Sequence, residues 1–444
     1  MKKGIERNLL YKVAAGIVAE LTKNGFKAYF AGGFTRDWLL GRPIKDIDIA
    51  TDARPDEVKE IFPTVFETGK AFGVLNLKRD DFIFEIATFR EEKGYSDGRH
   101  PDFVAYTKDA KIDSMRRDFT INSMFFSPDS REIIDYQRGL EDLSKGVIRT
   151  VGDPDKRFSE DYLRILRAIR FSSEYGFEIE KNTEAAMIKN SENLRKISAE
   201  RIRDELLKML LGFNPSDAFR KMEKTKVLNV IISQLSEMRN TEQDEIFHPE
   251  GDVMEHTLLM LSHMVSPSVE LALSVLFHDC GKPMTYLKGD DGRTHFYGHE
   301  DEGAKLAEKI MKDLRIPLNT IKTVSKIVAG HMRISAVSDM RKAKLSRFLC
   351  DKDFFYHLEL NRIDCISSHK KMQSFVFLLD KFAEFCVQPE MPRPLINGDD
   401  LIQLGLKPGP DFKKILRELY DKQLEDPDLT KEELLNKVKE DVLW

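Results

Sequence analysis

The chain has 444 residues, of which 41% are hydrophobic and 33% are charged, and its formal net charge is −5. This length exceeds one ordinary hydrophobic core and predicts several domains. The negative balance excludes a generally basic nucleic-acid-binding protein, so any contact with RNA must come from local patches. No apolar run is long enough to cross a bilayer, so we expect no membrane association.

From the N-terminal residues and the cysteines we expect a cytoplasmic protein. Residues 1–21 are basic and then apolar, but Glu6, Arg7 and Glu20 interrupt them at helical spacing, which predicts an amphipathic helix rather than a secretory signal. Cys280, Cys350, Cys365 and Cys386 form no CxxC pair, so reduced thiols are expected.

The secondary-structure pattern changes near residue 150. Apolar runs at 28–31, 47–49, 74–77 and 82–86 predict strands, the last two as a hairpin. Later segments, such as 161–171 and 199–211, have helical periodicity. We therefore expect an α+β head and a mostly α-helical remainder, with domains at 1–150, 151–242, 243–388 and 389–444.

Basic residues recur between Arg195 and Lys226 on helical sequence. A local RNA-binding patch is one interpretation. A solvated helix face is the other, and residue type alone favours it.

A glycine pair and two aspartates mark the head. Gly32 and Gly33 follow a predicted strand, where backbone N–H groups could approach a triphosphate closely. Asp46 and Asp48 flank Ile47 on a second predicted strand, whose period of two would send both carboxylates to one face. Ile47 and Ile49 would then enter the core.

Paired carboxylates suit phosphoryl or nucleotidyl transfer, because two divalent cations can stabilise both the entering and the leaving oxygens. Glu85 is the candidate third ligand, since it lies on a strand that could pair beside the aspartates. The alternative is that two aspartates merely end a strand.

The order of seven sequence blocks makes the pattern specific. The blocks are GGFTRDWLLGRPIKDIDIAT (32–51), EIATFR (85–90), DGRHPDFV (97–104), DSMRRDFTINSM (113–124), DYQRGLEDL (135–143), RFSEDYLRILRAIRF (157–171) and SAERIRDELLKML (198–210). Together they resemble the class II tRNA nucleotidyltransferases, which are CCA-adding enzymes, and the related poly(A) polymerases. The resemblance implies a polymerase-β-like head followed by a helical neck and body.

The resemblance also implies site residues. Asp46 and Asp48 would bind Mg²⁺, with Glu85 as the third catalytic carboxylate. The nucleotide-binding residues would be Gly32, Gly33, Arg36, Asp37, Arg116, Arg117, Asp118, Asn122, Asp161, Arg164, Arg167 and Arg170. The last four recur every third residue, which predicts one side of a helix, and Asp161 with Arg164 would read the incoming base. Without the resemblance, ion-paired helix faces would be the better interpretation.

Asp97-Gly-Arg-His-Pro101 resembles the loop that the family needs to switch from C to A addition. The resemblance therefore favours CCA addition to the 3′ end of tRNA from CTP and ATP. A-only addition to tRNA-CC, poly(A) tailing and non-enzymatic RNA binding are the alternatives, and oligomeric state stays open.

Seven of the ten histidines fall between His248 and His331, where even scattering would put about two. His256, His278, Asp279 and Asp364 resemble the ligands of HD phosphohydrolases, and His299 and His331 match the extra ligands of two-metal members. The resemblance implies a divalent metal of unknown identity, and phosphatase or 2′,3′-cyclic phosphodiesterase activity as a main or second function. A decayed site that only supports folding is the alternative.

Overall fold

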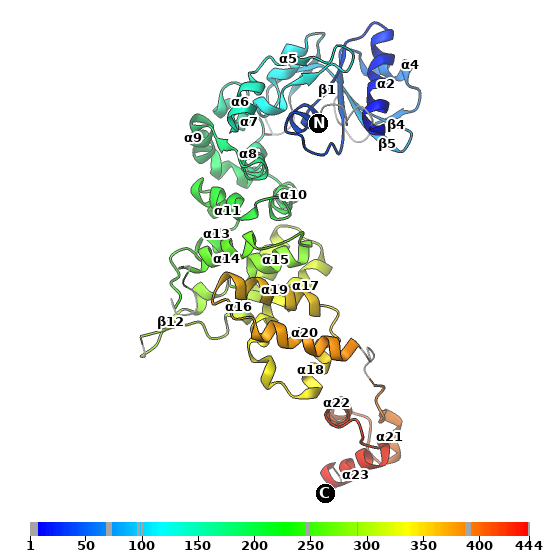
Figure 1. Cartoon of the computed structure of the whole chain (residues 1–444), viewed down its shortest axis with the longest axis vertical. Helices are drawn as coiled ribbons and strands as arrows, with labels where there is room; N and C mark the ends of the chain where they lie inside the picture. Colours follow the sequence, from blue (N-terminus) through cyan, green and yellow to red (C-terminus); the bar gives the residue numbers. More distant parts are fainter. Residues whose placement is uncertain are drawn as a thin grey trace. The chain divides into compact units, whose positions relative to one another are not determined.

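The structure is a computed structural model, and it describes residues 8–67, 73–95, 98, 101–244, 249, 251–290, 292–386 and 392–442. The chain divides into two compact units, Met1–Ser236 and Glu237–Trp444 (Figure 1). The first unit contains a sheet and helices. In the second, the described residues form helices and one short ribbon of β12 (Leu287–Lys288) and β13 (Thr294–His295).

A seven-stranded sheet organises the first unit, in the order β3-β4-β5-β2-β1-β8-β9. Its strands are β1 (Ala28–Ala31), β2 (Asp48–Thr51), β3 (Val65–Phe66), β4 (Val74–Arg79), β5 (Phe82–Thr88), β8 (Phe125–Phe126) and β9 (Ile133–Ile134). β4 and β5 form an antiparallel hairpin in which Arg79 pairs with Phe82, as predicted. β2 runs antiparallel to β1 and parallel to β5.

The core lies between this sheet and the helices α2 (Leu9–Lys23), α3 (Gly33–Leu39) and α4 (Pro55–Ile61). Ala14, Ile17, Val18 and Leu21 of α2 are fully buried, which confirms an amphipathic helix from Leu9 onward, whereas residues 1–7 of the prediction lie outside the described residues. Phe30 and Phe84 supply fully buried rings from the strands. Truncating such a ring to alanine typically costs about 3–5 kcal/mol, so this core fixes the strands that carry the head residues.

Helices follow the sheet in the first unit. They are α5 (Ala110–Met115), η1 (Thr120–Asn122), α6 (Gly139–Lys145), α7 (Pro154–Glu160), α8 (Leu163–Tyr175), α9 (Lys181–Asn190), η2 (Ser191–Lys196), α10 (Ala199–Leu210), α11 (Pro215–Lys224), α12 (Val227–Ile231) and α13 (Ser233–Ser236). The pairs β6 (Arg90–Lys93) with β7 (Phe103–Tyr106) and β10 (Val147–Ile148) with β11 (Glu178–Ile179) lie outside the main sheet. Asn214 caps α11, so a new helix begins shortly after α10 ends at Leu210.

The second unit is built around α15 (Val269–Phe277), of which seven of nine residues are buried. It is packed by α14 (Val253–Ser262), α16 (His299–Asp313), α17 (Leu318–Gly330) and α19 (Phe354–Ser367). The short 3-10 helices η3 (Lys282–Thr285) and η4 (His331–Asp339) follow α15 and α17. An element apolar on every side must be covered on every side, which places α15 at the centre.

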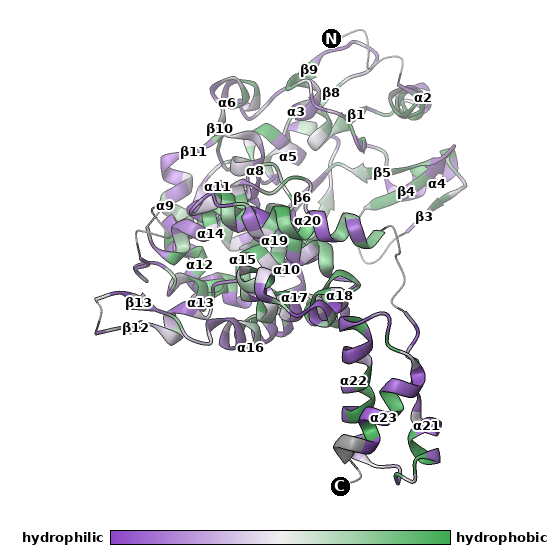
Figure 2. Ribbon diagram, turned by 60° about the horizontal axis from the view of Figure 1, so that its bottom comes forward, coloured by the Kyte–Doolittle hydropathy of each residue, from purple (hydrophilic) through white to green (hydrophobic). Residues whose placement is uncertain are grey.

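The chain ends in α18 (Lys342–Leu349), α20 (Gln373–Cys386), α21 (Gly398–Gln403), α22 (Pro410–Glu425) and α23 (Lys431–Val442). Hydrophilic and hydrophobic residues alternate along α22 (Figure 2), and Leu419 of this helix joins a small core with Ile396, Leu401 and Leu434. Among the described residues, no helix is both long and apolar enough to cross a membrane.

Candidate functional site

Asp48 is the first residue of β2, and Asp46 lies two residues before that strand. The prediction that both aspartates lie on a strand is therefore wrong for Asp46. Ala31, the last residue of β1, pairs with Asp48, and the chain then turns at Gly32 into α3, so residues before Asp48 have no strand partner there. Ile47 and Ile49 are both buried, as predicted.

The carboxylate of Asp48, at the start of β2, is affected by two other acidic residues. The parallel register that pairs Ile49 with Ile86 brings Asp48 beside Glu85. Burial raises the pKa of Asp48 to about 6, and the charges of Glu85 and Asp46 act in the same direction. A cation at this point would relieve the repulsion, so the residues present fit a divalent metal.

A hollow of about 210 Å³ opens beside these acids, and its lining includes Asp48, Glu85, Arg90, Arg116 and Arg117. Asp46 is exposed and does not line it. Carboxylates and guanidinium groups thus face one space. That combination can hold cations and phosphate oxygens together.

The turn at Gly32 brings the backbone against Asp48. Gly32 has φ +65°, and a Cβ there would lie 2.8 Å from Oδ2 of Asp48. At Gly33, a Cβ would lie 3.0 Å from a guanidinium nitrogen of Arg36. Only glycine combines a left-handed backbone with this close approach at position 32.

Arg36 and Asp37 lie in an internal network. Arg36 donates to both oxygens of Asp37, at 2.9 and 2.8 Å, and also to the side chain of Asn122. The hydroxyl of Tyr175 donates to Asp37 at 3.3 Å. These contacts connect α3 to η1 and α8.

Asp113 is a residue of this site that sequence reasoning did not single out. Arg116 donates to one of its oxygens at 2.8 Å and Arg117 to the other at 3.0 Å. Burial raises the pKa of Asp113, but the two arginines outweigh it and the pKa lies below its usual value. The signal was present, because Asp113 stands three and four residues before the arginines.

Asp118 joins this segment to α8. Arg167 donates to Oδ2 of Asp118 at 2.9 and 2.6 Å, and Asn122 donates to Oδ1 at 3.1 Å. Burial raises the pKa of Asp118, but Arg167, together with Asn122 and Arg164, outweighs burial and lowers the pKa to about 2. The structure therefore brings the predicted residues Asp118, Asn122 and Arg167 together.

Asp161 lies before α8, in extended backbone, and accepts a hydrogen bond from the backbone N–H of Leu163. The prediction that it shares a helix face with the three arginines is wrong, because α8 begins only at Leu163. Arg201 of α10 donates to both its oxygens, at 3.1 and 2.7 Å.

Arg164 and Arg170 are also paired within the protein. Arg164 forms an ion pair with Glu160 and donates to the carbonyl of Arg157 at 2.8 Å, and Arg170 pairs with Glu205 at 2.7 Å. Of the loop 97–101, only Gly98 and Pro101 belong to the described residues, so Asp97, Arg99 and His100 lie outside them.

Several basic residues between Arg195 and Lys226 also have acidic partners. Lys208 pairs with Glu205, Lys221 with Asp217, and Lys224 with Glu184. These ion pairs are compatible with both interpretations of this run, a solvated helix face and a local RNA-binding patch.

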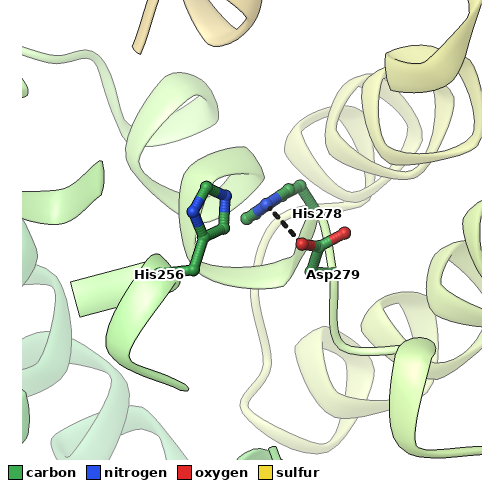
Figure 3. Close-up of side chains that lie close together, drawn as sticks. All are labelled: His256, His278 and Asp279. Carbon is green, nitrogen blue, oxygen red and sulfur yellow. Dashed lines mark ion pairs between the residues drawn. The ribbon is translucent and has the colours of Figure 1, made fainter. Parts of the chain in front are cut away.

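The second unit gathers the predicted metal ligands. Ligand atoms of His256, His278 and Asp279 lie within 4.8 Å of one another, as do those of Asp279, His299 and His331. Figure 3 shows the ring of His278 directed at the carboxylate of Asp279, with the ring of His256 beside it. Asp279 belongs to both of these groups. Oδ1 of Asp364, on α19, lies 3.2 Å from Nε2 of His256.

The backbone sets the tautomers of three of these histidines. Nδ1 of each ring donates to the carbonyl three residues earlier: His278 to Val275 at 2.9 Å, His299 to Phe296 at 2.8 Å, and His331 to Val328 at 2.7 Å. A carbonyl only accepts, so Nδ1 carries the hydrogen and Nε2 of a neutral ring keeps its lone pair. Metal-bound histidines are commonly oriented in this way.

Nε2 of His299 lies 3.2 Å from Nε2 of His331. A metal cation bound by both nitrogens satisfies this buried pair, as does a proton carried by one nitrogen and donated to the other. Oδ1 of Asp279 lies 3.4 Å from the first nitrogen and 3.7 Å from the second. Burial raises the pKa of Asp279, but His278 and Lys282 hold it well below its usual value. Two imidazoles and a carboxylate are ordinary ligands of a transition metal, so the residues present fit one.

Comparison with known families separates the two sites. Residues 28–149 match the family described as the Poly A polymerase head domain, and Asp46, Asp48, Glu85 and Asn122 lie within the match. This part of the chain is therefore similar to poly A polymerase head domains. Residues 176–238 match the probable RNA- and SrmB-binding site of polymerase A, and residues 253–353 match the HD domain. Of the predicted HD ligands, only Asp364 lies beyond that last match.

Curated relatives resemble about half of this chain. The CCA-adding enzyme of Leuconostoc mesenteroides is 44% identical over 218 residues, which are 49% of this chain and 54% of that protein. The CCA-adding enzyme of Enterococcus faecalis is 46% identical over 204 residues, 46% of this chain and 50% of that protein. The chain thus spans about half the length of the curated relatives it matches.

A solved structure extends the likeness of fold beyond the poly A polymerase head. The crystal structure of the Bacillus stearothermophilus CCA-adding enzyme in complex with CTP has a TM-score of 0.71 and 25% identity, and covers 98% of both chains. The head and RNA-binding matches, with these relatives, confirm the resemblance predicted from the seven blocks, and the HD match confirms the resemblance predicted from the histidines.

Proposed function

We propose that this chain adds CMP and AMP to the 3′ end of tRNA, taking both from their triphosphates and releasing pyrophosphate. One observation carries the proposal: Asp48 lies against the glycine turn and is affected by the charges of Glu85 and Asp46, within the residues that match the poly A polymerase head domain. The RNA-binding match at 176–238 supports RNA as the acceptor. Because the matched relatives are named CCA-adding enzymes, we propose tRNA as the acceptor.

In this proposal the 3′-hydroxyl of tRNA attacks the α-phosphate of the incoming nucleotide. Asp46 and Asp48 would hold Mg²⁺, with Glu85 as a further carboxylate, and the metal would supply charge neutralisation of the phosphates. The turn at Gly32 lets the phosphates approach the backbone. Arg116 and Arg117 line the hollow beside Asp48, and their guanidinium groups can bind phosphate oxygens.

Base selection would rest on Asp161 and Arg164. A carboxylate accepts from an exocyclic amino group and a guanidinium donates to ring nitrogen or carbonyl, so the pair can favour cytosine and adenine. Their pairing with Arg201 and Glu160 implies that an incoming base exchanges partners with these side chains. The complex of the Bacillus stearothermophilus enzyme with CTP supports C addition.

The test uses three tRNA substrates, ending at the discriminator base, at C and at CC, each with labelled CTP or ATP and Mg²⁺. CCA addition predicts CTP use on the first two and ATP use on the third. ATP use on the CC substrate alone would instead indicate A-only addition, and long ATP-derived tails a poly(A) polymerase.

A second activity is supported by the histidine cluster around Asp279. We propose a divalent metal there and hydrolysis of phosphate esters, as a phosphatase or 2′,3′-cyclic phosphodiesterase. The shared carboxylate and the aligned Nε2 atoms of His299 and His331 support it. Hydrolysis retained in Asp48→Asn and lost in Asp279→Ala, with the reverse pattern for nucleotide addition, would assign one reaction to each site.

The division at 1–150, 151–242, 243–388 and 389–444 and the cytoplasmic location also stay proposals. The junction near residues 388–393 falls largely outside the described residues.

A further inference from the structure

The metal cluster of the second unit opens into a cavity of about 660 Å³. His278, Asp279, His299, His331 and Asp364 contribute to its lining. Pockets for organic ligands generally have about 300–1,000 Å³. A phosphate group and its metals fill only part of such a volume, so the cavity has room for the rest of an organic phosphate.

An aromatic wall, formed by His295, Phe296 and Tyr297, lines one part of this cavity. The rings of His295 and Tyr297 are stacked, with centroids 5.3 Å apart and planes 7° from parallel. Tyr297 is 73% exposed, although a tyrosine side chain gains by burying its ring. The exposed ring of Tyr297, stacked on the partly buried ring of His295, is a platform on which a nucleobase can stack.

Three contacts hold the aromatic wall and its ribbon close to the candidate metal ligands. Arg293 reaches across to Asp244, with Nε 3.9 Å from Oδ2. Tyr286 packs edge-on against Phe296, with centroids 5.9 Å apart. The carbonyl of Phe296 accepts the hydrogen bond from Nδ1 of His299, so the wall stands directly before a candidate metal ligand.

The cavity lining also includes two lysines, beside the carboxylates of Asp244, Asp279 and Asp364. The lysines are Lys282 and Lys371, and Nζ of Lys282 lies 2.7 Å from Oδ2 of Asp279. The polar groups of Ser335, Ser368 and Gln373 lie in the same lining and can bond a sugar or a base edge. Anionic, polar and flat aromatic portions of one ligand would each meet a matching surface.

We propose that this cavity binds a nucleoside monophosphate, with Tyr297 and His295 as the base-stacking residues that determine specificity. The placement of the phosphate at the cluster rests on the hydrolytic activity proposed above, whereas the stacking of the base does not. The ligand is either a free nucleotide or the 3′-terminal nucleotide of an RNA, because both present the same base, sugar and phosphate.

Crosslinking locates the ligand independently of catalysis. The full chain in EDTA is irradiated with 8-azidoadenosine monophosphate, or with a short RNA ending in 8-azidoadenosine 3′-phosphate, and adducts are mapped by mass spectrometry. An adduct on residues 294–297 is expected, and the probe that gives it identifies the source. Adducts confined to the first unit with both probes would overturn the proposal.

Calorimetric titration then tests the stacking. Tyr297→Ala should weaken binding of adenosine monophosphate roughly five- to hundredfold, the range expected for one stacked base. Tyr297→Phe keeps the ring and should bind like the wild type, and ribose 5-phosphate should bind all three proteins equally. Equal binding of adenosine monophosphate by all three, or an equal loss for ribose 5-phosphate, would overturn the assignment.

Two controls separate this inference from the proposed functions. Arg164→Ala, in the first unit, should leave the adduct on residues 294–297 unchanged. Glycerol 2-phosphate has no base, so its hydrolysis reports on the metal cluster alone. Hydrolysis of this ester without the adduct would support the proposed hydrolase and contradict base stacking on the aromatic wall. The adduct without any hydrolysis would support base stacking and contradict the proposed hydrolase.

Discussion

Gly32 and Asp48 approach so closely that a Cβ on residue 32 would lie 2.8 Å from the carboxylate oxygen Oδ2. Gly32 also has φ +65°. The turn after β1 and the first residue of β2 therefore form one unit, in which backbone and carboxylate face the same space. A change at either residue should therefore disturb the other.

Gly32→Ala should disturb both the turn and the carboxylate. A left-handed backbone costs a non-glycine residue about 1–2 kcal/mol, and displacement of Asp48 adds to it. We expect a free energy of unfolding lower by about 1–3 kcal/mol and nucleotide addition reduced at least about tenfold. Gly25→Ala is the matched control, because Gly25 has φ +89° with nothing within 4 Å of its Cβ. It should lose stability but keep its activity, and equal activity losses in the two variants would contradict the account.

Asp48→Asn should separate activity from stability. Asp48 is mostly ionised at pH 7.5, but its raised pKa means that the ionised carboxylate is less stable in the folded, metal-free protein than in the unfolded chain. The neutral amide removes that penalty, so thermal unfolding in EDTA should occur at a higher temperature than in the wild type. Nucleotide addition should fall by about a hundredfold or more, because a metal ligand is lost. Asp81→Asn, in the exposed turn between β4 and β5, should change neither quantity.

The ion pair of Asp118 with Arg167 predicts a pH dependence of stability. The folded-state pKa of Asp118, about 2, lies below the ordinary value of 3.8, so the stabilisation is full above about pH 4 and is lost as the pH falls toward 2. At pH 7 Asp118→Asn should therefore cost about 2 kcal/mol of unfolding free energy. Chemical denaturation at several pH values measures the difference between the variant and the wild type, which should shrink between pH 4 and 2. A difference that stays constant over this range would contradict the pairing.

The sequence was sufficient where the pattern is local. The alternation of Ile47 and Ile49 predicted their burial, and the apolar runs predicted β1 and the hairpin of β4 and β5. The spacing of residues in the sequence predicted the wrong local structure where contacts with other elements decide it. Asp46 lies outside β2 because β1, the partner strand, ends at Ala31. Asp161 lies outside α8, and its carboxylate accepts hydrogen bonds from Arg201 of α10.

The candidate sites show the same division. Residue types alone left ion-paired helix faces as the preferred interpretation of Arg164 and Arg170, and only the order of the seven blocks favoured nucleotide binding. In the structure both side chains are ion-paired. The short distance between Nε2 of His299 and Nε2 of His331 joins two helix ends that are 32 residues apart in the sequence. No spacing rule predicts that contact.

The histidine cluster predicts a bound metal. The purified full chain should retain a transition metal through gel filtration, and dialysis against EDTA should lower its thermal unfolding temperature, because a ligand that binds only the folded state stabilises it. His331→Gln should lose metal and show no further effect of EDTA. His263→Gln, whose histidine bonds to Ser367 outside the cluster, should retain metal like the wild type. Equal metal content in the two variants would contradict the assignment, and elemental analysis measures it.

The central claim is that Asp46 and Asp48 hold the cations that meet the incoming triphosphate. The most direct measurement is anomalous diffraction from crystals of the full chain grown with Mn²⁺ and a CTP analogue that cannot be cleaved between its α- and β-phosphates. The account predicts manganese bound to the carboxylates of Asp46 and Asp48 and to the triphosphate of the analogue. A bound analogue whose manganese lies away from both carboxylates would contradict it.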